Sequence, residues 1–98
     1  MINRIVRMSF VPGKVDEFLG IFNESKMKIA AFDGCKELKL LRDAKASNIF
    51  FTFSIWEDET KLDAYRFSEL FKRTWSRTKI LFNEKPQAWS TLIEDDVK

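Results

Sequence analysis

Three aromatic residues in the second half of the chain, Tyr65, Phe71 and Trp75, could wall a site for a flat aromatic ligand. Aromatic faces bury a large apolar area, and the Tyr O–H and Trp N–H add polar contacts. Phe71 and Trp75 stand four residues apart, which places them on one face of a helix. The alternative is that all three belong to an aromatic hydrophobic core, and the sequence leaves both interpretations open.

A cation near the start of the chain could complement such a site. Arg4 shares a strand face with apolar residues. Inside a pocket, its guanidinium could hold an enolate or phenolate oxygen that develops charge during an oxidation. The alternative is an arginine near the strand end that reaches solvent. Arg7 and Arg66 are weaker candidates for the same role.

The composition removes most other chemistry. The 98 residues include no histidine, which excludes the commonest metal ligand, the usual general base and every Ser-His or Cys-His arrangement. We expect no metal and no cofactor. The single cysteine, Cys35, cannot form an internal disulfide, which favours the reducing cytoplasm.

Charge and length indicate one globular domain over residues 1–98, with a frayed tail from about residue 95. Hydrophobic residues make up 45% and charged residues 33% of the chain, and the net charge is only +2. That charge favours neither a nucleic acid nor a membrane surface as a partner. No apolar run approaches the roughly 18 residues that a membrane span requires.

The hydrophobic periodicity predicts strands and helices that would position these residues. The order is β-α-β-β-α-β with the second helical region split in two, which predicts a ferredoxin-like α+β fold with helices on one face of a four-stranded antiparallel sheet. Asp58 and Ser68 are expected to cap the two halves of the split region, with Phe67 on the apolar side of the first. The predicted strands span 2–10, 35–43, 48–56 and 87–94, and the predicted helices span 14–32 and, in two parts, 57–82.

The strand over residues 48–56 carries bulky apolar side chains on both faces. Ile49, Phe51, Phe53 and Ile55 alternate with Phe50 and Trp56. Helices can cover only one of these faces, so a second subunit packing sheet against sheet is expected, and we predict a homodimer.

Four segments, in this order, give the chain a resemblance to the antibiotic biosynthesis monooxygenase superfamily, the dimeric α+β barrels. They are Val11-Pro12-Gly13-Lys14, Phe32-Asp33-Gly34-Cys35, Phe53-Ser54-Ile55-Trp56-Glu57-Asp58 and Ser68-Glu69-Leu70-Phe71. The resemblance implies a homodimer with a pocket in each subunit between helices and sheet. Known members include monooxygenases that act on aromatic polyketides or quinols with neither metal nor flavin.

The superfamily also contains heme-degrading enzymes, and this chain departs from them at their key positions. Their strand Asn, helix Trp and heme-ligating His correspond to Val6, Tyr65 and Trp75 here. Valine cannot donate a hydrogen bond, and the indole nitrogen carries its hydrogen and cannot ligate iron. We therefore expect no heme degradation.

The resemblance and the residues together predict a cofactor-independent monooxygenase that acts on a small aromatic or quinol-like substrate. A non-catalytic small-molecule-binding or structural dimeric module of the same fold is the alternative. The candidate pocket residues are Arg4, Val6, Tyr65, Phe71 and Trp75.

Overall fold

The elements of the chain follow the predicted order, as a computed structural model of all residues 1–98 shows. A single 3-10 turn, η1 (Pro12–Lys14), joins the first strand to the first helix. The strands are β1 (Ile2–Ser9), β2 (Cys35–Arg42), β3 (Ile49–Trp56) and β4 (Gln87–Thr91), and the helices are α1 (Val15–Ala30), α2 (Glu59–Arg66) and α3 (Glu69–Lys79).

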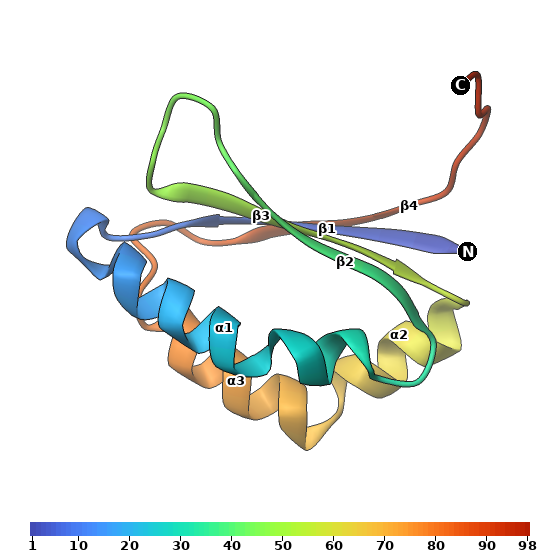
Figure 1. The fold of residues 1–98 in the computed structure, drawn as a ribbon, viewed down its shortest axis with the longest axis horizontal. Helices are drawn as coiled ribbons and strands as arrows, with labels where there is room; N and C mark the ends of the chain where they lie inside the picture. The colour runs from blue at the N-terminus through green and yellow to red at the C-terminus, as the bar shows by residue number, and fades with distance from the viewer.

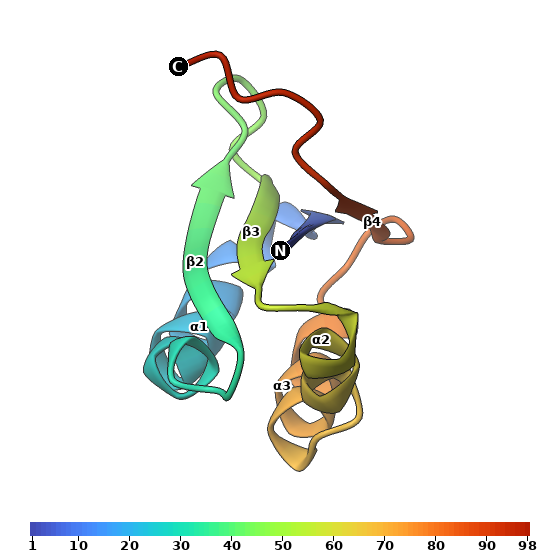
Figure 2. The same ribbon diagram turned by 90° about the vertical axis from the view of Figure 1, so that its right-hand side faces the viewer.

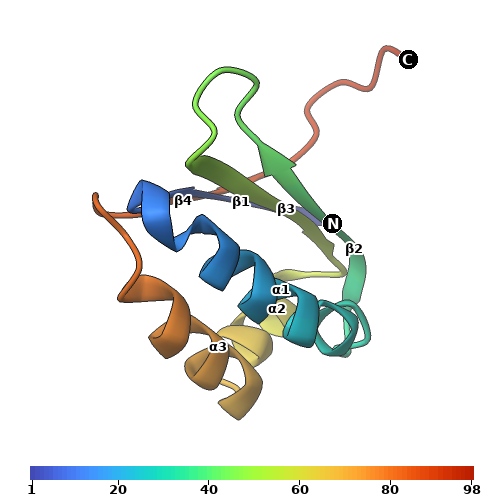
Figure 3. The same cartoon turned by 60° about the vertical axis from the view of Figure 1, so that its left-hand side comes forward.

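The four strands form one antiparallel sheet in the order β2-β3-β1-β4. All three helices lie on one face of that sheet, and the other face is bare (Figures 1 and 2). Helices α1 and α3 run side by side beneath the sheet (Figure 3). The predicted ferredoxin-like α+β fold is therefore confirmed.

Local signals in the sequence set the ends of the helices. Asp58 accepts a hydrogen bond from the backbone N–H of Lys61 and so caps α2, and Ser68 caps α3 in the same way. Gly34 follows α1 with a positive φ of 90°, where a Cβ would collide with the Lys61 side chain. Both predicted caps are confirmed.

The hydrophobic core lies between the helices and the β1–β3 centre of the sheet. Its centre is Phe10, which is fully buried and stacks on Phe18 with ring centroids 4.1 Å apart. The cluster consists of Met8, Phe10, Val15, Phe18, Ile21, Phe50 and Leu81. The buried face of α1 also includes Ser25, whose hydroxyl donates to the Ile21 carbonyl at 2.9 Å.

Most element ends lie within two residues of the prediction, but two ends and the packing of one residue differ more. Strand β4 stops at Thr91 instead of residue 94, because Thr91 pairs with Asn3 and β1 has almost no residues left to extend the ladder. Helix α3 stops at Lys79, while Phe82 forms an isolated bridge with Phe10. Phe67 is 76% exposed at the junction of α2 and α3, so its predicted apolar packing is wrong.

The helices are also too short or too polar to cross a lipid bilayer.

Candidate functional site

A cavity of about 330 Å³ lies between the sheet and the split helical region. All five candidate residues line it: Arg4 and Val6 from β1, Tyr65 from α2, and Phe71 and Trp75 from α3. Residues far apart in the sequence thus meet around one space. The volume falls at the lower end of the roughly 300–1,000 Å³ of ligand pockets, which suits a small ligand.

One wall of the cavity is a continuous series of aromatic rings. Tyr65 stacks on Trp56 with centroids 4.9 Å apart and meets Phe71 edge-on at 5.3 Å. Phe71 and Trp75 are nearly parallel, with 13° between their planes and 5.7 Å between centroids. Trp75 then contacts Phe82 at 5.5 Å. The aromatic residues therefore serve both as cavity wall and as an extension of the core.

The bend between α2 and α3 brings Tyr65 and Phe71 together. The Ser68 hydroxyl accepts from the Phe71 N–H at 3.1 Å and donates to the Tyr65 carbonyl at 2.6 Å. One side chain thus ends the first helix and begins the second. Because both bonds are local in sequence, the two rings are held at a fixed spacing.

The polar groups in the cavity wall are few, and some of them hydrogen-bond within the protein. Ser54 accepts a hydrogen bond from the Trp56 indole N–H at 2.9 Å, and Thr78 donates to the Thr74 carbonyl at 2.8 Å. The lining contains no carboxylate and no lysine. The wall can therefore pack against a flat apolar ligand but offers no conventional proton acceptor.

Two arginines supply the only formal charges in the lining. The Arg4 Nη1 donates to the Ser90 hydroxyl at 3.0 Å, and Arg66 lies 3.9 Å from Asp63. Burial first, and then the nearby Arg66 charge, lower the pKa of Arg4, while Asp63 raises it. Arg4 therefore faces the cavity and is partly removed from solvent.

Two positions were assigned differently or missed by sequence reasoning. Arg7 points to the opposite face of the sheet and pairs with Glu84 at 3.4 Å, so this weaker candidate is not a cavity residue. Trp56 was identified only as one of the bulky residues of the strand over 48–56, yet it forms the buried end of the aromatic wall. Trp56 shares a strand face with Phe50 and Ser54, and this shared face was the signal that could have found it.

The Tyr65 side chain is half-buried in the cavity wall. Burial, with a smaller contribution from Cys35, raises the pKa of Tyr65 well above its usual range. The hydroxyl therefore stays neutral, and it can donate a hydrogen bond to a ligand over the whole physiological pH range.

Tyr65 is the only tyrosine in the chain, so tyrosinate absorbance reports its ionisation alone. We expect the native protein to ionise far above the ordinary value of about 10, and the urea-unfolded chain to return to it. Since the folded pKa is raised, the free energy of unfolding should fall as pH rises above the unfolded value. In Tyr65→Phe, the part of this decrease in the free energy of unfolding that comes from tyrosine ionisation should be absent. Native ionisation near pH 10 would contradict the burial of this phenol.

Known proteins share this architecture. The family model described as antibiotic biosynthesis monooxygenase matches residues 1–76. A crystal structure of an antibiotic biosynthesis monooxygenase superposes with a TM-score of 0.91 at 20% identity, covering 97% of this chain and 100% of that one.

Two further solved structures are similarly close in fold. A conserved protein from Methanosarcina mazei has a TM-score of 0.88 at 19% identity, over 92% of this chain and 89% of that one. A variant of SnoaB, a cofactor-independent oxygenase from Streptomyces nogalater, has a TM-score of 0.86 at 16% identity, over 98% of this chain and 95% of that one. A search of curated protein sequences finds no significant match.

Proposed function

Since the chain belongs to the antibiotic biosynthesis monooxygenase family, we propose that it is a cofactor-independent monooxygenase acting on a small aromatic or quinol-like substrate. The observation that carries this proposal is the aromatic-walled cavity with Arg4 in its lining. The ring of the substrate would lie against Phe71 and Trp75, with its oxygen toward the arginine.

The proposed reaction draws its electrons from the substrate. A phenol and dioxygen give a quinone and water: a ring carbon gains a C–O bond, the O–O bond breaks, and the second oxygen leaves as water with the phenolic and ring hydrogens. The substrate is oxidised by four electrons, which reduce dioxygen completely, so no external reductant is needed.

The residues would contribute binding, orientation and electrostatics. The Arg4 guanidinium would stabilise the charge that develops on the substrate oxygen, and the neutral Tyr65 hydroxyl could donate a further hydrogen bond. Phe71 and Trp75 would hold the ring in one orientation and keep water from the reacting carbon.

One observation favours the alternative of a non-catalytic binding module. No carboxylate, histidine or lysine lines the cavity, so none of the usual side-chain bases can remove a proton from a neutral substrate there. A binding protein needs no such base.

Oxygen consumption separates the two functions. The wild-type chain should accelerate dioxygen uptake by a panel of naphthols and benzene diols over a protein-free control, and label from isotopic dioxygen should enter the quinone product. Arg4→Gln should slow uptake, by about tenfold to a hundredfold if the guanidinium stabilises the developing oxyanion. Tight binding of the same compounds with no uptake above the control would leave only the binding module.

We also propose that the protein is a homodimer formed through the bare face of the sheet. Phe53 lies at the centre of this face, in register with Ile5 of β1, and Ile5 lies opposite Trp89 of β4. Phe51 and Leu41 continue the patch on β3 and β2. Trp89 is 44% exposed in the single chain, and a second copy would remove this apolar surface from water.

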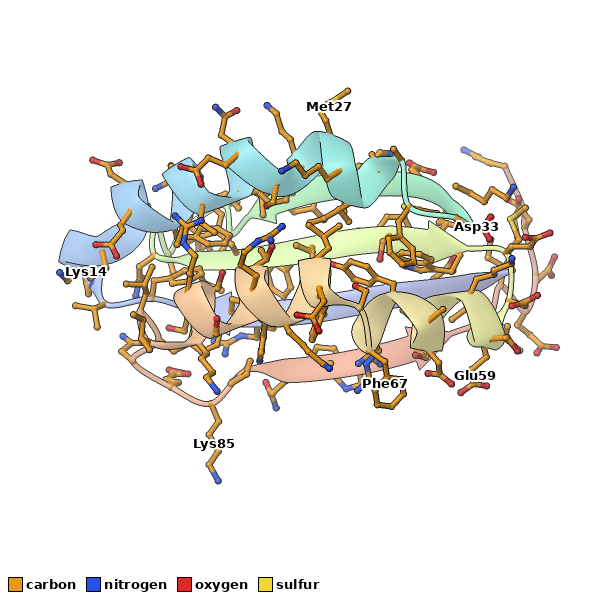
Figure 4. The ribbon with its side chains drawn as sticks, turned by 90° about the horizontal axis from the view of Figure 1, so that it is seen from below. Lys14, Met27, Asp33, Glu59, Phe67 and Lys85 are labelled. Carbon is orange, nitrogen blue, oxygen red and sulfur yellow. The ribbon has the colours of Figure 1, made fainter.

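Sedimentation equilibrium at micromolar concentration should give twice the chain mass of 11.6 kDa. Phe53→Asp should give the monomer, because dimerisation would have to bury a charged carboxylate in place of an apolar ring. Met27→Asp is the matched control: Met27 is 73% exposed on α1, in the helix layer, and points outward at the edge of the molecule (Figure 4). A monomeric wild type would overturn the proposed dimer.

Heme should not be degraded by this chain. The position of the heme-ligating His holds Trp75, whose indole nitrogen carries its hydrogen and cannot ligate iron, and the position of the strand Asn holds Val6, which cannot donate a hydrogen bond. Hemin with a reductant should lose its Soret absorbance no faster than a free-heme control. A defined cleavage product would show this expectation to be wrong.

A further inference from the structure

We propose that the cavity selects an aromatic ligand that carries an anionic oxygen group, a carboxylate or a phenolate, held by Arg4 and Arg66 together. This inference rests on the proposed function only in taking the cavity as the ligand site. It adds the charge of the ligand and a second recognition residue.

The lining of the cavity carries an excess of positive charge. Arg4 and Arg66 are the only charged residues in its lining, and both are cations. Arg66 has Asp63 at 3.9 Å, a distance too long for a good hydrogen bond. The hydrogen bond that Arg4 makes goes to the neutral Ser90 hydroxyl. The pair is therefore incompletely neutralised by the protein.

Arg4 is partly buried, and a second cation lies nearby. Burial and the neighbouring Arg66 cation both lower the pKa of Arg4, and the negative charge of Asp63 offsets them only in part. Arginine nevertheless remains protonated, so the unfavourable energy persists until an anion arrives. A ligand anion would recover it through charge-assisted hydrogen bonds, which a neutral ligand cannot form equally well.

The placement of the two arginines indicates how the ligand lies. Arg4 comes from strand β1 and Arg66 from the last turn of α2, so they approach from the sheet layer and the helix layer (Figure 2). Arg66 is exposed, whereas Trp56 and Leu62 in the same lining are buried. The anionic oxygen would therefore lie at the open side of the cavity, and the ring would lie toward the buried side.

An ionised ligand also suits the chemistry of the lining. Because no carboxylate, histidine or lysine is present to accept a proton, a substrate that arrives already as a phenolate needs no base to become electron-rich. The arginine pair would favour that ionised form at neutral pH.

Calorimetric titration with matched neutral and anionic probes tests the inference. The carboxylate arm compares 2-naphthoate with 2-naphthamide, which has nearly the same shape and no charge; the phenolate arm compares 2,4-dinitrophenolate with 2,4-dinitroanisole. In at least one arm the anion should bind about tenfold or more tightly than its neutral partner, and the arm that does so identifies the anion.

Arginine variants then assign the effect to these side chains. Arg4→Gln and Arg66→Gln should each weaken the preferred anion by about tenfold and change the neutral probe by less than about twofold. Arg66 is exposed, so its variant should fold even if the Arg4 variant does not. Arg73→Gln, on the exposed face of α3, removes the same charge and should change neither the affinity for the anionic probe nor that for the neutral probe.

Equal affinity for anion and neutral partner in both arms would overturn the inference, as would failure of all four probes to bind, or unchanged anion affinity in the Arg66 variant. These results are distinct from a failure of the proposed function. Anion-selective binding without oxygen uptake would contradict only the proposed oxygenase activity. Oxygen uptake without anion selectivity would contradict only the proposed anion recognition.

Discussion

Replacing Trp56 with alanine should lower the free energy of unfolding by about 3–5 kcal/mol. Trp56 is 1% exposed, stacks on Tyr65 and donates its indole N–H to Ser54. The substitution leaves a large void and a buried hydroxyl without its donor. Domains of this size are stabilised by only about 5–15 kcal/mol, so the loss is a large part of the total.

Thermal melts at one fixed protein concentration measure this effect. A domain of this length loses about 4–8 °C of Tm for each kcal/mol, so Trp56→Ala should melt more than about 10 °C below wild type. Trp56→Phe is the control, since the phenyl ring keeps most of the contact with Tyr65 and should cost less. A Trp56→Ala melt within a few degrees of wild type would contradict the packing described for β3.

Replacing Trp75 with alanine should affect ligand binding more than stability. Trp75 lines the cavity, stacks on Phe71 and is only partly buried. Loss of one aromatic stacking surface costs about 1–3 kcal/mol, which corresponds to roughly fivefold to a hundredfold in affinity for 2-naphthoate or dinitrophenolate. The loss of unfolding free energy should be smaller than that of Trp56→Ala, because the ring of Trp75 already borders a cavity.

The Trp56 and Trp75 variants are a matched pair, as the same side chain is removed from two positions in one wall. A Trp75→Ala variant that melts as low as Trp56→Ala and binds the probe with wild-type affinity would assign Trp75 to the core. That outcome would leave Phe71 without a partner in ligand stacking.

Local signals explain why so much of the fold could be predicted. The cap residues Asp58 and Ser68 each accept from a backbone N–H three positions away, so the sequence around them is sufficient. The alternation along β3 likewise reports burial directly, with Phe50, Ser54 and Trp56 buried on the helix side.

One error falls where a distant segment decides. The apolar pattern of residues 87–94 shows no reason to stop at Thr91, because the limit is the length of β1, to which β4 pairs. The other error has a local cause. Phe67 is the C-cap residue of α2, next to the Ser68 hydroxyl that ends this helix, so the predicted Ser68 cap already indicated that Phe67 lies outside the packed face.

The candidate site shows the same division. The spacing of Phe71 and Trp75 predicts that they share a face, and the family resemblance directs attention to Val6 and Tyr65. The placement of Arg4 and Arg66 around one cavity depends on how α2 packs beneath the sheet, a tertiary relation without a sequence pattern. Sequence analysis therefore found the two arginines but could not place them together.

A crystal structure of the protein with the anionic probe that binds tighter tests the central claim most directly. The account predicts the probe ring against Phe71 and Trp75, with its anionic group within hydrogen-bond distance, about 2.7–3.2 Å, of both Arg4 and Arg66. A probe bound elsewhere on the chain, or one whose anionic group points away from either arginine, would contradict the account.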